Sequence, residues 1–188
     1  AHRGQLATAR AVRRLLEGGD FEKTLAVHSE AGHAQTEEYR SETTLFIPRE
    51  QDRLTEFVVL RERVGHEPVP FDAEDAVVIT EKLSLRLGAA AGDPIEIENA
   101  DGETATVTVT GVTENYVQSF VYMTDHAYRS AFGSTPEYTS VLAVSTAETE
   151  EQRDDLATRM LEASNIAGVQ FTATTQESFE DMLKSINT

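Results

Sequence analysis

The side chains of this sequence that could do metal or acid–base chemistry are histidines and carboxylates, because it contains no cysteine. Thiol catalysis, thiolate metal sites and disulfides are therefore excluded. His28 and His33 lie five residues apart. A zinc pair on a helix needs a spacing of four, and no third ligand is near in the sequence. We therefore expect no metal here, and we expect 29–33 to be a loop between strands at 24–28 and 39–47.

A second candidate for metal binding is the acidic run Asp72-Ala73-Glu74-Asp75. An EF-hand loop starting at Asp72 would require glycine where Val77 stands and glutamate where Leu83 stands. We therefore interpret the run as a solvated acidic turn. The 33 acidic residues of the chain offer so many carboxylate pairs that no glycosidase-type pair can be singled out.

Motifs for nucleophilic catalysis and nucleotide binding are missing from the sequence. No G-x-S-x-G occurs, so there is no nucleophile elbow. Gly88 and Gly92 fit neither a dinucleotide fingerprint nor a phosphate-binding loop. The sequence therefore predicts no catalytic, cofactor-binding or metal-binding residue, and a domain that is not an enzyme.

Aromatic side chains could line a ligand groove, although packing in the core is their commoner fate. The candidates are Tyr116, Phe120, Tyr122 and Tyr128. If one of them is exposed, we expect it to be Phe120, because the residues before it, Gln118 and Ser119, are polar.

The charge of the chain limits its partners. Lys and Arg number 16 and Asp and Glu number 33, which gives a formal net charge of −17. Such a surface repels phosphate, so nucleic acid and anionic lipid headgroups are unlikely partners. The densest positive cluster is Arg10, Arg13 and Arg14, on a helix predicted at 6–16. We interpret it as a solvated or docking face, with contact to a membrane surface as the alternative.

The elements that must position any site are clearest in a central unit, residues 76–132. It begins with a buried strand at 76–79, and Thr80 is expected to cap a short helix. Leu83 and Leu87 share one face of that helix, and Gly88 stands where a helix commonly ends in a left-handed residue.

The same unit continues into a hairpin. Ile95 and Ile97 alternate with glutamates, and the turn Asp101-Gly102 leads to a return strand at 105–109. Gly111 interrupts the alternation, which indicates a β-bulge or a close backbone approach.

The later elements alternate irregularly. Thr124 is expected to cap a helix that carries Tyr128 and Phe132 and ends at Gly133. A short helix or turn leading into a strand is predicted over 54–60, one strand or two strands with a kink over 112–123, and a strand over 141–144. A capping box, Ser145–Glu148, precedes a helix that is expected to bury Leu156 and Met160, with Leu161 as a further candidate. A last strand starts at Val169 and Phe171, and a second capping box, Thr174–Glu177, opens a helix over 175–188 whose apolar stripe is Phe179, Met182, Leu183 and Ile186.

This order of elements predicts an α+β fold with a mixed or antiparallel sheet, one hairpin and packed helices. The 188 residues suffice for one domain, 1–188, or for two lobes that share a core, with a boundary near Pro68. No apolar run approaches the ~18–20 residues that span a bilayer. The chain starts at Ala1 without Met, as expected for a processed or excised piece.

An ordered series of short motifs resembles the extracytoplasmic domain of FtsX-like, MacB-type ABC transporter permeases. The similarity extends from about Pro68 to Val144 and is greatest to the second extracellular domain of large Gram-positive permeases. The motifs are Ile79–Leu83, Leu87-Gly88, Gly92-Asp93, Val109–Val112, Glu114-Asn115-Tyr116 and Tyr122-Met123.

The resemblance implies a bacterial domain on the outer side of the cell membrane, flanked by the transmembrane helices of its own permease. It implies that a cytoplasmic ATPase subunit hydrolyses ATP and that this domain passes the motion to an extracellular protein, peptide or lipid. The family gives its residues no catalytic duty; Gly88 and Gly111 would only shape the central unit. Two alternatives remain open: a docking module that recruits or activates a cell-wall hydrolase without transporting cargo, and a secreted hydrolase that uses carboxylates.

Overall fold

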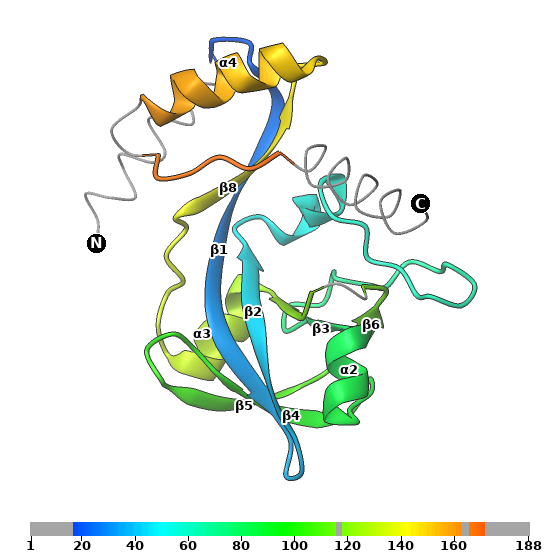
Figure 1. The fold of residues 1–188 in the computed structure, drawn as a ribbon. Coiled ribbons are helices and arrows are strands. Elements are labelled where there is room, and N and C mark those ends of the chain that lie inside the picture. The colour runs from blue at the N-terminus through cyan, green and yellow to red at the C-terminus, as the bar shows by residue number, and fades with distance from the viewer. Residues whose placement is uncertain (1–16, 116–117, 163–165, 172–188) are drawn as a thin grey trace, which may run out of the picture. The chain divides into compact units, whose positions relative to one another are not determined.

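The computed structural model describes residues 17–115, 118–162 and 166–171. They divide into two compact units, Thr24–Val144 and a second that joins His2–Lys23 to Ser145–Thr188. Pro68 therefore lies inside the first unit. In chain order (Figure 1), the elements are β1 (Phe21–Gln35), β2 (Arg40–Pro48), the 3-10 helix η1 (Gln51–Glu56), β3 (Val77–Thr80), α2 (Glu81–Leu87), β4 (Pro94–Glu98), β5 (Thr104–Thr108), β6 (Gly111–Thr113), β7 (Phe120–Met123), α3 (Asp125–Phe132), β8 (Ser140–Ser145) and α4 (Glu150–Leu161).

The strands form one mixed sheet, so the predicted α+β class is confirmed. Their order is β5-β4-β1-β2-β7-β3-β6, and β8 pairs with β1 outside this path. The pairs β2–β7 and β3–β6 are parallel. The pairs β1–β2, β1–β4, β3–β7 and β4–β5 are antiparallel.

Both faces of this sheet are buried along its middle strands. In β2, Leu45 and Ile47 point into one core and Phe46 into the other. In β3 and β7 the neighbours Val78 and Ile79, like Val121 and Tyr122, divide in the same way. Because side chains alternate along a strand, two cores on opposite faces require consecutive apolar residues. This requirement explains the continuous apolar runs of these strands.

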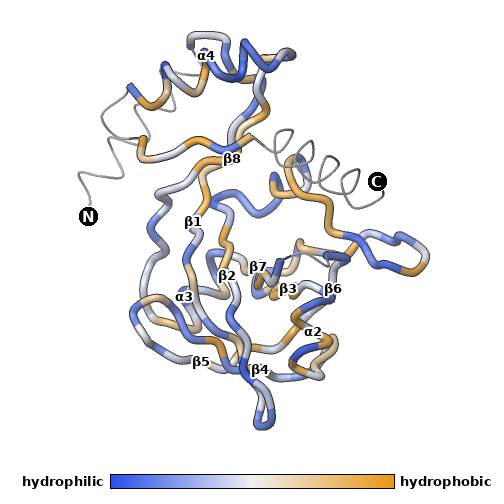
Figure 2. Tube along the Cα trace, viewed as in Figure 1, coloured by the Kyte–Doolittle hydropathy of each residue, from blue (hydrophilic) through white to orange (hydrophobic). Residues whose placement is uncertain are grey.

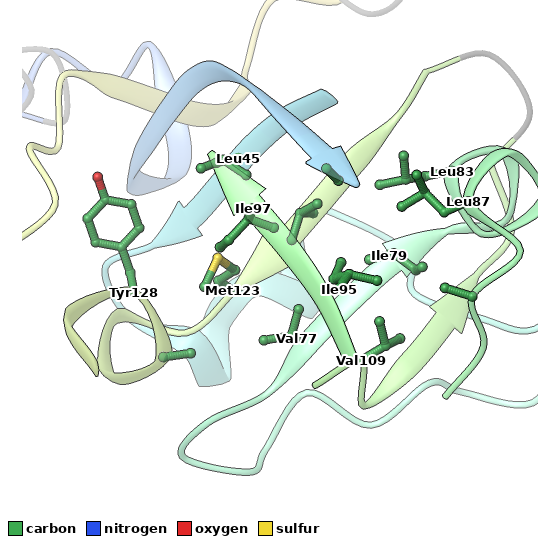
Figure 3. Close-up of a cluster of buried hydrophobic side chains, with 14 of the residues drawn as sticks. Leu45, Val77, Ile79, Leu83, Leu87, Ile95, Ile97, Val109, Met123 and Tyr128 are labelled. Carbon is green, nitrogen blue, oxygen red and sulfur yellow. The ribbon is translucent and has the colours of Figure 1, made fainter. Parts of the chain in front are cut away.

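The first core packs the sheet against α2, α3 and the β4–β5 hairpin. Figure 3 shows how side chains from these elements converge. Its fully buried members include Leu45, Ile79, Leu83, Ile95, Ile97 and Met123. Each such side chain stabilises the fold by roughly 1.5–3 kcal/mol relative to an exposed position.

The second core lies against η1 and the connection between η1 and β3. Leu54 of η1, Leu60 and Val69 contribute to it. We expected a strand after η1, and this was wrong, because 57–60 is irregular and only an isolated bridge joins Arg61 to Pro68. In Figure 2 the first part of this connection is hydrophobic and the loop that follows is largely hydrophilic. Leu60 is buried in the second core and Phe57 and Val58 pack against it, whereas Val59 is exposed.

The start of the central unit folds largely as predicted. β3 is followed by α2, whose Leu83 and Leu87 are buried and which ends at Gly88 with φ +63°. Thr80 is the N-cap residue, but its side chain makes no capping hydrogen bond. Its hydroxyl instead accepts a hydrogen bond from the backbone N–H of Phe120, at 3.2 Å. Thr80 therefore ties β3 to β7.

The hairpin of the central unit is also confirmed. Ile95 pairs with Val107 and Ile97 with Ala105. Gly111 lies in an unbroken parallel register opposite Val78. A β-carbon at this position would lie 2.6 Å from Cγ1 of Val69. The close approach is thus confirmed and the bulge is wrong.

The segment 29–33 is not the loop that we expected. β1 runs without a break from Phe21 to Gln35, and 27–35 pairs residue by residue with β2. The buried positions change phase along the strand: Leu25 and Val27 enter the second core, whereas Ala34 enters the first. Each half of β1 is thus buried on one face only, and the polar residues between the halves lie where the burial changes face.

The later helices agree with the sequence in part. The Thr124 hydroxyl caps α3 by accepting from the N–H of Ala127, at 3.1 Å, and Gly133 ends α3. The stretch 112–123, predicted as one strand or as two strands with a kink, forms two strands, β6 and β7, and β8 is found where expected.

In the second unit, the capping box of α4 is formed by Thr149 and Gln152 rather than by Ser145 and Glu148. Ser145 accepts from the N–H of Ala147 in a local turn. Leu156 is buried as expected and Met160 is partly buried, whereas Leu161, the further candidate, is exposed. Arg159 pairs with Asp20 at 3.0 Å.

Val169 and Phe171 lie in irregular structure, so the last strand was wrong there. The predicted helix 6–16, the second capping box and the helix 175–188 lie outside the described residues. None of the described helices combines the length and the apolar character that a bilayer crossing needs.

Gly111→Ala should destabilise the first unit by about 1–3 kcal/mol, because the new methyl group overpacks the second core at Val69. Combined with Val69→Ala, which removes the contacting Cγ1, the same change should cost clearly less. Urea unfolding of the four proteins of this double-mutant cycle measures the coupling free energy. A cycle that shows no coupling would mean that Val69 is not the obstacle.

Unfolding should also depend on alkaline pH through Tyr122. Burial raises the pKa of Tyr122 from 10.0 to about 12. The contribution of protonated Tyr122 to the free energy of unfolding is complete below the pKa of this tyrosine in the unfolded chain, ~10. This contribution is lost as the pH rises through the folded-state pKa of about 12. Tyr122→Phe should reduce this loss by on the order of 1–3 kcal/mol. Urea midpoints between pH 9 and 12 measure it, with Tyr39→Phe at an exposed position as control. Equal pH slopes in wild type and Tyr122→Phe would contradict the assignment.

Candidate functional site

The two histidines weighed as metal ligands both lie in β1, not in a loop. Because they are five residues apart on a strand, they point to opposite faces of the sheet. His28 faces Tyr128 with ring centroids 5.3 Å apart. His33 contacts Glu98, with 3.5 Å between Nδ1 and Oε1. In the described part of the chain, no three His, Asp or Glu side chains gather as a metal site would require.

His28 belongs to a polar network with Glu30 and Tyr128. Nδ1 of His28 donates to the carbonyl oxygen of Glu137 at 2.7 Å. Nε2 lies 3.2 Å from Oε1 of Glu30, within ion-pair distance but without hydrogen-bond geometry. The Tyr128 hydroxyl donates to the same oxygen at 3.1 Å. The side chains of His28 and Glu30 are only 12% and 13% exposed.

The network fixes three segments to β1. Glu30 also accepts, at 3.4 Å, from the N–H of Ala100 at the tip of the β4–β5 hairpin. Burial, and after it the neighbouring Glu30 carboxylate, raise the pKa of Tyr128 to about 12. A tyrosine with a raised pKa keeps its proton at neutral pH and serves as a hydrogen-bond donor. The arrangement therefore anchors α3, the hairpin tip and Glu137 to β1.

A polar groove of about 670 Å³ opens where β1, β2, α2 and the β4–β5 hairpin meet. His33, Glu42, Lys82, Arg86 and Glu98 bring both signs of charge to it. The Thr43 hydroxyl at its wall already donates to the carbonyl oxygen of Ser119, at 3.0 Å. Among the described residues, no serine or threonine hydroxyl hydrogen-bonds to His33, so the nucleophile–base pair that covalent catalysis needs is not formed here.

The aromatic residues proposed for a ligand groove are separated by the sheet. Phe120 and Tyr122 stack at 5.5 Å and contact Phe46 in the second core. Tyr128 packs on Phe132 in the first core, at 4.9 Å. Phe120 is partly exposed and the two tyrosines are buried, in the order that we expected. Tyr116 lies outside the described residues.

The acidic run forms a turn before β3. Its backbone carbonyls at Asp72 and Ala73 accept from Nε2 of Gln51, at 3.2 and 3.4 Å. Gly88 and Gly92 both have positive φ, at a helix end and in a turn. Positive φ at a helix end and in a turn is what we expected of these two glycines.

Nothing in the sequence singles out Glu30 or Gly32, although both shape this region. A β-carbon at Gly32 would lie 2.3 Å from the carbonyl oxygen of Glu98. Glu30 lies beside Tyr128 only because β1 continues through 29–33 as an unbroken strand. The sequence feature that could have indicated this strand is the spacing by two of Glu30, Gly32 and Ala34, which lie on one face.

Comparisons with known proteins place the fold. No protein-family profile matches the sequence, and no curated protein matches it. The periplasmic region of MacB from Actinobacillus actinomycetemcomitans superposes with a TM-score of 0.50 at 12% identity, over 92% of this chain and 82% of that chain.

Two further solved structures are similar to this chain. The extracellular domain of the noncanonic ABC-type transporter YknZ from Gram-positive bacteria superposes with a TM-score of 0.48 at 16% identity, over 79% of this chain and 76% of that chain. A domain of a putative permease protein from Porphyromonas gingivalis superposes with a TM-score of 0.43 at 12% identity, over 80% of this chain and 74% of that chain. At these identities the likeness concerns the fold. The chain has an α+β fold similar to that of a MacB-type periplasmic domain, as the resemblance of its motifs predicted.

Proposed function

We propose that this chain is the extracytoplasmic domain of an ABC transporter permease and passes ATP-driven motion to a substrate or partner outside the cell. The observation that supports this most is the similarity of fold to the periplasmic region of MacB over 92% of the chain. The transmembrane helices of the same permease and a cytoplasmic ATPase would then be its partners.

The chemistry of the described residues is compatible with this role. The polar groove holds no nucleophile–base pair, and the network around Glu30 anchors elements. We propose that the domain is not an enzyme and that ATP is hydrolysed elsewhere in the transporter.

The double-sided burial of the sheet supports a mechanical role. With a core on each face, β2, β7 and β3 cannot slide relative to their neighbours without opening close-packed contacts on both sides. Such a sheet moves as one body. The first unit therefore transmits a displacement of one of its ends to the rest of its surface with little internal deformation.

The location can be tested with a single cysteine, because the chain has none of its own. Glu37→Cys lies in the exposed turn between β1 and β2. In intact cells that make the full-length permease, a membrane-impermeant maleimide should label this cysteine. Ala76→Cys, at a buried position, should be labelled only after denaturation. Labelling of Glu37→Cys only after cell lysis would contradict an outward location.

The transmission of motion can be tested on the full-length permease with its ATPase in nanodiscs. A spin label at Glu37→Cys and a second label at the outer end of a flanking membrane span report one distance. Trapping the transporter with ATP and vanadate should shift this distance beyond the width of its distribution. In a separate calorimetric titration, Mg-ATP should give no binding heat with the isolated 188-residue chain. An unchanged distance would refute the transmission, and micromolar ATP binding would refute the assignment of hydrolysis to another subunit.

A further inference from the structure

Two aliphatic side chains of the first unit stand out by their exposure. Val64 is 76% exposed and Leu85 is 73% exposed. A single exposed apolar residue is ordinary on a protein surface. These two, however, line the same groove, which has a volume of about 420 Å³. We call it the β6 groove.

The β6 groove has two walls and a floor that come from separate parts of the chain. One wall is the hairpin 61–68, closed by the hydrogen bond from the N–H of Glu62 to the carbonyl oxygen of Glu67, at 2.8 Å. The other wall is α2, which carries Leu85. The floor is β6, which lines the groove with Gly111 and Val112.

β6 is the last strand of the sheet and pairs only with β3 in the described order. At the end of its outer edge, the backbone of Arg61 makes two hydrogen bonds. The N–H of Arg61 donates to the Thr113 hydroxyl, and the carbonyl oxygen of Arg61 accepts from the N–H of Glu114. An edge strand with one open side accepts an extended segment of another chain.

The polar groups of the groove indicate what such a segment would carry. Oε1 of Glu81 pairs with Nε of Arg63 at 3.0 Å, whereas Oε2 of Glu81 is covered and makes no hydrogen bond with the described residues. The Glu81 side chain is only 17% exposed. A covered carboxylate oxygen without a donor is unfavourable, so a cation that enters the groove and displaces the cover of Oε2 gains a charge-assisted hydrogen bond.

The charge of the lining is negative. Three carboxylates, those of Glu62, Glu81 and Glu114, line the groove with the guanidinium of Arg63, and Glu114 pairs with Arg61 at 2.9 Å. This lining disfavours anionic lipid headgroups and favours a cation. The aliphatic walls in turn favour apolar side chains on either side of that cation.

We propose that the β6 groove docks an extended segment of a partner protein, in which a lysine or arginine pairs with Glu81 and neighbouring aliphatic side chains contact Val64 and Leu85. This proposal goes beyond the proposed function and does not depend on transport. The groove fixes the position of the bound segment. Its cation must reach Glu81 at the start of α2 while its aliphatic residues lie between the two walls.

A random octapeptide library displayed on cells tests the proposal. Sorting against the 188-residue chain should enrich peptides with one Lys or Arg flanked by aliphatic residues. The most enriched peptide is then synthesised, and its affinity is measured by fluorescence anisotropy. Glu81→Gln should weaken binding about tenfold or more, the scale of a lost charge-assisted hydrogen bond. Leu85→Asp should weaken it at least as much.

Matched controls separate the groove from general charge and hydrophobicity. Glu74→Gln removes one negative charge at an exposed carboxylate outside the groove, and Val59→Asp changes an exposed aliphatic residue outside it. Both should bind the peptide like wild type, and thermal melts should show that all four variants fold.

Three results would overturn the proposal. The library could yield no enriched peptide, or peptides whose affinity Glu81→Gln and Leu85→Asp leave unchanged. Alternatively, vesicles of phosphatidylglycerol and phosphatidylethanolamine could capture the chain in a way that Leu85→Asp abolishes, which would assign the groove to a membrane.

Discussion

The burial of one sheet on both faces is the constraint on which the rest of this structure depends. It requires apolar residues at consecutive positions of β2, β7 and β3, and it requires cover on each side. α2, α3 and the β4–β5 hairpin supply the cover for the first core. η1 and an irregular connection supply it for the second. The irregular connection is stable without being a strand because Leu60 and Val69 are buried in that core.

The same constraint explains which parts of the fold could be predicted from sequence. β3, α2 and the β4–β5 hairpin were predictable because their signals are local: a short apolar run, a glycine at a helix end and an Asp-Gly turn. β1 was not, because its two halves are buried on opposite faces. Neither half shows a long alternation, and the residues between them are polar. Only the pairing of 27–35 with β2, a long-range interaction, shows that the strand continues.

The start of α4 was predicted at the wrong residues for a related reason. Ser145 and Glu148 have the spacing of a capping box, and so have Thr149 and Gln152. Spacing alone cannot choose between two candidates four residues apart. Thr80 is a more subtle case: it begins α2, but its hydroxyl bonds to the backbone of Phe120 on another strand. A residue type favoured at helix starts was thus correctly placed, and tertiary structure decided its hydrogen bond.

The candidate sites depended on long-range structure even more. The β6 groove joins Val64, Leu85 and Gly111, which are far apart in the sequence and have no shared motif. The network around Glu30 joins β1 to Tyr128 and Ala100 in the same way. Sequence reasoning could exclude thiol chemistry and known nucleotide motifs, because those depend on residue types and short spacings. It could not locate a docking surface, because such a surface is defined by which side chains remain uncovered.

The charge of the chain takes on a more specific meaning in this light. Many of the cations of the first unit are already engaged: Arg53 with Glu56, Arg61 with Glu114, and Arg129 with Asp125. Most of the net charge of −17 therefore remains as carboxylates without a cation of their own. Such a field attracts basic partners to the whole surface and raises their rate of encounter, but it does not select among them. Selection requires a place where a cation gains a bond that it cannot gain elsewhere, and we propose that the Glu81 carboxylate, which lines the β6 groove together with Val64 and Leu85, offers one.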